Sequence, residues 1–158
     1  MAKVNPIPAG NGAPTPYLSI DGAAKAIDFY KTVFGAQEVV RHDMGGRIGH
    51  AELRIGNGLL MLADEFPEMD FRGPKSMGGS PVMLNLYVEN VDEVFRRAEA
   101  AGATVVRPVA DQFYGDRSGQ FTDPFGHRWN VTTHVEDVSY EEMERRSKAY
   151  TEKLKSGA

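Results

Sequence analysis

The chain has 158 residues, of which 41% are hydrophobic and 25% are charged, and its formal net charge is −4. These values are typical of a globular domain with its own core, and the mixed, weakly acidic charge argues against nucleic-acid or membrane partners. The absence of cysteine excludes disulfides and thiolate sites and fits the cytoplasmic location that we expect.

Residues 1–14 contain Pro, Gly and Asn but no apolar run, which predicts an extended arm rather than a signal peptide. A β-prone run at 17–20 comes next, and a helix is then expected with Asp21 as its N-cap and Gly35 at its end. The helix has an apolar stripe at helical spacing, made by Ala23, Ile27, Tyr30 and Phe34. Three strand-like runs follow, at about 36–42, 47–55 and 59–64.

The same order of elements then repeats. A strand is expected at 82–88, and a helix follows with Asn90 as N-cap, Glu93 completing a capping box, and Gly102 at its end. Further strands are expected at about 104–109, 119–123 and 128–135. The repeat predicts an α+β fold with two βαβββ modules, at about 15–64 and 81–137, within one domain over 15–137. Residues 65–80, rich in Pro, Gly and Met, are the expected linker.

A C-terminal helix or tail is expected over 138–158, because residues 139–142 read Ser-Tyr-Glu-Glu and form a capping box. The helix is highly charged, and its few apolar residues are Tyr140, Met143, Tyr150 and Leu154. It is either a solvated tail helix or a lid or arm that packs on another surface.

Several segments form a characteristic series. Residues 15–22 read Thr-Pro-Tyr-Leu-Ser-Ile-Asp-Gly, residues 27–36 read Ile-Asp-Phe-Tyr-Lys-Thr-Val-Phe-Gly-Ala, and residues 123–129 read Asp-Pro-Phe-Gly-His-Arg-Trp. In their order and spacing they resemble the glyoxalase/bleomycin-resistance/dioxygenase superfamily, also called vicinal oxygen chelate proteins. Residues 50–56 and 113–119 resemble its PhnB-like branch. The resemblance covers about 15–137 and is much more specific for a fold than for a reaction.

This resemblance implies a cup-shaped mixed sheet with helices outside and a small-molecule site within. Enzymes of the superfamily bind a divalent metal through His, Gln or Glu on the first and last strand of each module. Those positions correspond here to Thr15, Met83, Asn130 and an apolar position within 59–62. None of these is a usual ligand for Zn²⁺, Ni²⁺ or Mn²⁺, so we expect the standard metal centre to be missing and no cofactor to be bound.

His50 and Glu52 are the candidate catalytic pair. In the strand 48–55 they alternate with Ala51 and Leu53, so strand geometry places them on one face. An imidazole beside a carboxylate can transfer a proton near neutral pH, or it can bind a metal at a non-standard site. The alternative is an ordinary hydrogen-bonded strand face.

The candidate substrate-binding residues lie in the second module. Met83 and Asn85 share one strand face, and Asn130 and His134 share another. Aromatic and basic side chains in the 113–119 loop suit a planar or anionic ligand at the rim of the cup. The complete set is Met83, Asn85, Tyr114, Arg117, Asn130 and His134.

Two functions therefore remain open. The first is a metal-free binding protein for an unidentified small molecule, as the bleomycin-resistance resemblance implies. The second is a lyase or isomerase that acts beside a carbonyl and uses His50 and Glu52. The family resemblance and the C-terminal helix also predict a homodimer.

Overall fold

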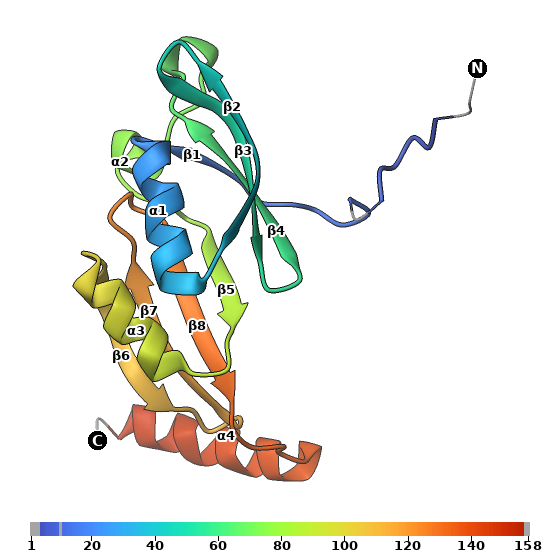
Figure 1. Cartoon of the computed structure of the whole chain (residues 1–158). Helices are drawn as coiled ribbons and strands as arrows, with labels where there is room; N and C mark the ends of the chain where they lie inside the picture. Colours follow the sequence, from blue (N-terminus) through green and yellow to red (C-terminus); the bar gives the residue numbers. More distant parts are fainter. Residues whose placement is uncertain (1–3, 10, 157–158) are drawn as a thin grey trace. The chain divides into compact units, whose positions relative to one another are not determined.

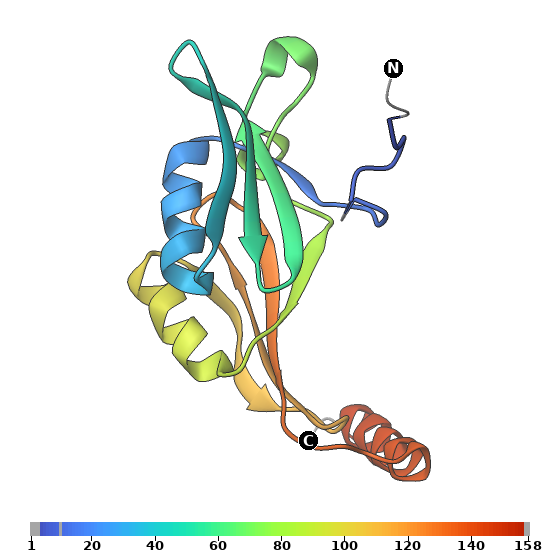
Figure 2. The same cartoon turned by 45° about the vertical axis from the view of Figure 1, so that its right-hand side comes forward.

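The protein consists of two βαβββ modules, each with a four-stranded mixed sheet and a helix against one face (Figures 1 and 2). The computed structural model describes residues 4–9 and 11–156. The chain divides into two units between Met77 and Gly78, a point that lies within the linker expected at 65–80. The α+β class and the two modules are as the sequence predicts.

The first module contains one helix and four strands in the predicted order. They are β1 (Tyr17–Ile20), α1 (Ala23–Phe34), β2 (Gln37–Met44), β3 (Arg47–Ile55) and β4 (Gly58–Asp64). The strand order across the sheet is β1-β4-β3-β2, with β1 parallel to β4 and the other pairs antiparallel. A short 3₁₀ helix η1 (Pro67–Met69) and a one-turn helix α2 (Pro74–Met77) follow β4.

The core of the first module lies between α1 and the sheet. Ile27 and Tyr30 of α1 are fully buried, and so are Ala51 and Leu53 of β3 and Leu62 of β4. Because burying one large apolar side chain contributes about 1.5–3 kcal/mol, this layer is a main source of the module's stability. Helix α1 covers this face of the sheet and leaves the opposite face open.

The N-terminus of α1 differs from the prediction. The N-cap position is Gly22, and no side chain caps the helix locally, so the expected role of Asp21 is wrong. Instead Asp64, at the end of β4, accepts hydrogen bonds from the backbone N–H of Gly22 at 3.2 Å and of Ala23 at 2.8 Å. The other end of α1 is as predicted, with Gly35 in the left-handed conformation at φ 68°.

The second module repeats the first. Its elements are β5 (Met83–Tyr87), α3 (Val91–Ala100), β6 (Thr104–Asp111), β7 (Asp116–Thr122) and β8 (Arg128–His134). The strand order is β5-β8-β7-β6, again with one parallel pair, β5 with β8. The predicted cap of α3 is confirmed, since the Asn90 side chain accepts a hydrogen bond from the backbone N–H of Glu93 at 3.0 Å.

The core of the second module lies between α3 and β7 and β8. Phe95 packs edge-to-face on Phe121 with ring centroids 5.3 Å apart, and Trp129 and Val131 are buried beside them. Gly119 is required here, because a Cβ atom at this position would lie 2.5 Å from the ring of Phe95. The helix can therefore approach β7 closely.

The C-terminal helix α4 (Tyr140–Lys155) contacts the second module through residues near the middle of the helix. Arg146 forms a bidentate ion pair with Glu136, with both N–O distances at 2.7 Å, and donates to the Phe113 carbonyl at 3.3 Å. The rings of Phe113 and Tyr150 lie 5.1 Å apart. The predicted Ser139 cap is confirmed. Within the described residues, no helix is long and apolar enough to cross a membrane.

Candidate functional site

His50 and Glu52 lie on the face of the first sheet that α1 leaves open. Ala51 and Leu53 are fully buried, whereas the side chains of His50 and Glu52 are 30% and 25% exposed, as the alternation predicts. The imidazole Nε2 is 3.2 Å from Glu52 Oε1. The predicted pair is therefore in hydrogen-bonding contact.

Tyr17 extends this pair to a chain of three side chains. Its hydroxyl is 3.0 Å from His50 Nδ1, and the two rings meet edge-on with centroids 5.4 Å apart. The contact follows from the strand order, because β4 lies between β1 and β3 and its Met61 is opposite both Tyr17 and Glu52. Tyr17 was not among the site residues predicted from the sequence. The one available signal was its position on a strand that alternates Tyr17 and Ser19 with apolar Leu18 and Ile20.

An apolar pocket of about 280 Å³ lies on the first module, next to the hydrogen-bonded side chains of Tyr17, His50 and Glu52. It is lined by Tyr17, Met44, Gly49, Ala63, Phe66, Met69 and Phe71. Three of these residues come from the segment after β4, where Phe66 and Phe71 form an antiparallel bridge. Phe71 also packs on Tyr17, with ring centroids 5.4 Å apart. Residues of the expected linker thus form a wall of the pocket.

Arg47, the first residue of β3, holds this wall in place. Its guanidinium lies 4.1 Å from the centroid of the Phe66 ring and donates a hydrogen bond to the Glu65 carbonyl at 3.2 Å. It also pairs with Glu68 at 2.9 Å. A stacked and paired guanidinium fixes the orientation of the aromatic side chain beneath it. Arg47 therefore fixes the position of Phe66 in the wall of the pocket.

The geometry of the Tyr17–His50–Glu52 contacts determines which group donates and which accepts each hydrogen bond. When Nε2 of neutral His50 donates to the Glu52 carboxylate, Nδ1 is an acceptor and receives a hydrogen bond from the Tyr17 hydroxyl. Burial raises the pKa of the Tyr17 phenol above its ordinary value of 10.0, so the hydroxyl stays protonated at neutral pH. Tyr17 is also the member of the chain that lines the pocket. Tyr17 therefore lines an apolar pocket and also carries a hydroxyl that contacts an imidazole, which in turn contacts a carboxylate.

The candidate residues on β5 and β8 are brought together in the second module. Asn130 Nδ2 donates to Asn85 Oδ1 at 2.6 Å and to Thr132 Oγ1 at 3.1 Å. Met83 lies on the same face of β5 as Asn85, and its side chain is exposed. The open face of this sheet is therefore polar at its centre.

His134 belongs to a second cluster on that face. Its Nδ1 is 2.8 Å from Oδ1 of the buried Asp116, whose Oδ2 accepts the Tyr87 hydroxyl at 2.7 Å, and its Nε2 is 3.0 Å from Asp137. The bonds to Asp116 and Asp137 raise the pKa of His134 above 6.5, and the bond to Asp116 raises that of Tyr87 above 10.0. The role of Asp116 was missed because its partners lie 18 and 29 residues away.

Arg117 and Tyr114 are placed differently from the expectation of a common rim. Arg117 lies on the face of β7 that meets α3, where its guanidinium binds Asp92 at 2.7 and 2.9 Å and Asp111 at 2.9 Å. Tyr114 is in the loop before β7, and its ring packs on Phe113. Because strand neighbours point to opposite faces, Arg117 is turned away from Asp116 and the polar face. Its cation is already neutralised by carboxylates of its own module.

The four positions that would hold a metal in superfamily enzymes do not fit that role here. The Asn130 amide is committed to Asn85 and Thr132, Met83 offers a thioether, Thr15 offers only a hydroxyl, and the position within 59–62 is apolar. Hard and borderline divalent cations prefer carboxylate and imidazole ligands. Within residues 4–9 and 11–156, no group of three or more His, Asp or Glu side chains is arranged to hold a metal ion.

Comparisons with known proteins agree with this architecture. An uncharacterized protein of Mycobacterium tuberculosis is 44% identical over 134 residues, which cover 82% of this chain and 79% of the relative. The crystal structure of TioX from Micromonospora sp. ML1 matches with 28% identity and a TM-score of 0.59, over 81% of this chain and 100% of that one.

A PhnB protein from Bacillus cereus shares the fold, with a TM-score of 0.60 and 21% identity over 76% of this chain and 98% of that one. The family model described as Glyoxalase/Bleomycin resistance protein/Dioxygenase superfamily matches residues 17–131, most of the chain and both modules. The chain therefore belongs to the glyoxalase/bleomycin resistance protein/dioxygenase superfamily.

Proposed function

We propose that this protein binds a small, largely apolar molecule with one hydrogen-bonding group, and that the first module holds it without a metal. The observation that carries this proposal is the position of Tyr17. Its ring lines the apolar pocket, while its hydroxyl is bound to His50 at 3.0 Å. Small-molecule sites generally combine an apolar lining with a few placed polar groups.

The lining favours an aromatic ligand. Phe66, Phe71 and Tyr17 offer aromatic surfaces, and Met44 and Met69 offer polarizable sulfur. Aromatic pairs and sulfur–aromatic contacts each contribute about 0.3–1.5 kcal/mol beyond the burial of area. With its proton donated to His50, the Tyr17 hydroxyl can accept a hydrogen bond from a ligand hydroxyl, which gives the pocket one specific polar contact.

A titration with 4-ethylphenol tests this proposal, with ¹³C-labelled methionine methyl groups as reporters. We expect saturable shifts of Met44 and Met69, which line the pocket, and none of Met143 on α4. Phe71→Ala should weaken binding, and Tyr150→Phe on α4 is the matched control. Shifts confined to methionines outside the pocket, or an affinity unchanged by Phe71→Ala, would refute the assignment.

A second candidate is a lyase or isomerase that moves a proton beside a carbonyl group. The order Glu52–His50–Tyr17 favours it, because a carboxylate orients the imidazole and the imidazole contacts a hydroxyl at the pocket. A proton moving between His50 and a bound molecule would pass through the Tyr17 hydroxyl. Such acid–base catalysis contributes about 10²–10⁴-fold to a rate.

Hydrogen–deuterium exchange separates this candidate from binding alone. With phenylacetone in D₂O, an enzyme should accelerate loss of the proton next to the carbonyl, and His50→Gln should remove the acceleration. The Tyr150→Phe variant should keep it. Exchange at the buffer rate with the wild-type protein would leave the binding function and exclude catalysis on this carbonyl probe.

A further inference from the structure

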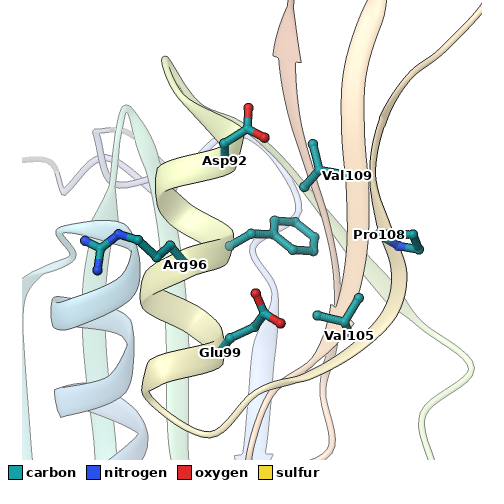
Figure 3. Close-up of a pocket in the computed structure, with 7 residues that line it drawn as sticks. Asp92, Arg96, Glu99, Val105, Pro108 and Val109 are labelled. Carbon is teal, nitrogen blue, oxygen red and sulfur yellow. The ribbon is translucent and has the colours of Figure 1, made fainter.

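A separate groove of about 290 Å³ lies on the second module, between α3 and the edge strand β6 (Figure 3). Its apolar lining comes from Phe95 of α3 and from Val105, Pro108 and Val109 of β6. Phe95 is largely buried and belongs to the module core, so this part of the groove is fixed. The strand side is an edge of the sheet, since β6 pairs only with β7 among the described strands.

Two carboxylates stand on the helix side of this groove. Asp92 and Glu99 are seven residues apart on α3, or about 10 Å along a helix axis. Arg96 lies between them in sequence, but its guanidinium is bound bidentately to Glu93 at 2.6 and 2.9 Å. Figure 3 shows Arg96 turned away from β6, whereas Asp92 and Glu99 are on the side that faces it. The Arg96 guanidinium is thus held away from the interior of the groove.

The two carboxylates are not equivalent. Both oxygens of Asp92 accept hydrogen bonds from Arg117, at 2.7 and 2.9 Å, so its charge is largely neutralised. The backbone carbonyl of Glu99 accepts the N–H of Gly102 at 3.0 Å, but its side-chain carboxylate has no hydrogen bond or ion pair in the part of the chain that the structure describes. An anionic ligand would be repelled, and one carboxylate without imidazole is a poor site for a divalent metal. The complementary ligand has one positive charge and an apolar body.

We propose that this groove binds a primary organic ammonium ion, with the ammonium at Glu99 and the apolar body on Phe95, Val105 and Val109. The site is independent of the pocket on the first module and of the function proposed there. Its ion pair is exposed, so affinity should fall as salt screens it.

The test is an amide-resolved NMR titration of the full chain with 2-phenylethylamine and with the neutral analogue 2-phenylethanol. We expect the amine to shift residues of α3 and β6 in a saturable way, and the alcohol to bind more weakly. Glu99→Gln should reduce amine affinity by about two- to fivefold, as expected for an exposed ion pair, and should leave the alcohol unchanged.

Glu141→Gln on the exposed first turn of α4 is the matched control and should leave amine affinity unchanged. Val109→Lys would place a cation in the groove and should abolish amine binding, with the melting temperature measured to confirm folding. The proposal is overturned if amine and alcohol bind equally, if Glu99→Gln has no effect, or if the shifts fall on other elements.

Discussion

Asp64 caps α1 from the far end of β4, through a 2.8 Å hydrogen bond from the backbone N–H of Ala23. The same carboxylate accepts the N–H of Ile48 at 2.6 Å through its other oxygen. One side chain therefore joins the helix, β3 and β4 of the first module.

We expect Asp64→Ala to destabilise the protein by about 1–3 kcal/mol, because a capping acceptor and the partner of a part-buried N–H are both lost. Asp21→Ala is the matched control. Asp21 is exposed and caps nothing, so its removal should change the free energy of unfolding by less than about 0.5 kcal/mol. Urea unfolding of both variants measures the difference, and equal effects would contradict the assignment of the cap.

The turn between β7 and β8 depends on Asp123. Its Oδ1 accepts the N–H groups of Phe125 and His127, and its Oδ2 accepts the indole N–H of Trp129 at 2.9 Å. Asp123→Ala should lower the free energy of unfolding by at least about 1–3 kcal/mol, because buried donors lose their acceptor.

The chain has one tryptophan, so the fluorescence of Trp129 reports directly on this turn. We expect the Asp123→Ala spectrum to change before global unfolding, whereas Asp123→Asn, which keeps one acceptor, should have a smaller effect. Identical spectra and stability for the alanine variant and the wild type would show that the turn does not need the carboxylate.

His134 predicts a pH dependence for the second module. Asp116 and then Asp137 raise its pKa above 6.5 in the folded state. The stabilisation by the protonated ring is therefore fully present below about pH 6.5 and is lost as the pH rises through the higher folded pKa. NMR titration of the ring should give a midpoint above 6.5, and Asp116→Asn should lower it. A wild-type midpoint at or below 6.5 would contradict the contacts.

We also expect a homodimer, because α4 exposes apolar side chains and cyclic pairs are the commonest soluble assembly. Tyr140 and Leu154 are 78% and 63% exposed. Sedimentation should give twice the chain mass of 17.4 kDa at micromolar concentration, and Leu154→Glu should shift the equilibrium toward the monomer. A wild-type mass of one chain would disprove the dimer.

Much of the fold could be predicted because its signals are local. The β3 boundaries, the Asn90 and Ser139 caps and the end of α1 at Gly35 all depend on residues within a few positions of one another. Alternation also placed His50 beside Glu52 correctly.

The remaining features depend on which strands become neighbours. Tyr17 meets His50 across 33 residues, and Asp64 reaches Gly22 across 42. Arg117 was predicted to lie in a loop at the rim of the cup, but β7 begins at Asp116, three residues before its predicted start, and Arg117 follows the strand alternation toward α3. No short window of sequence contains these contacts.

The most direct test of the proposed function compares 4-ethylphenol with ethylbenzene, which lacks the hydroxyl, on the wild-type protein and on Tyr17→Phe. The substitution removes only the phenol oxygen that is bound to His50. We expect Tyr17→Phe to lose about 0.5–1.5 kcal/mol of binding free energy for 4-ethylphenol, as for one hydrogen bond, and to bind ethylbenzene as the wild type does. Equal affinity of the wild type and Tyr17→Phe for 4-ethylphenol would contradict the role of Tyr17 as the polar anchor of the pocket.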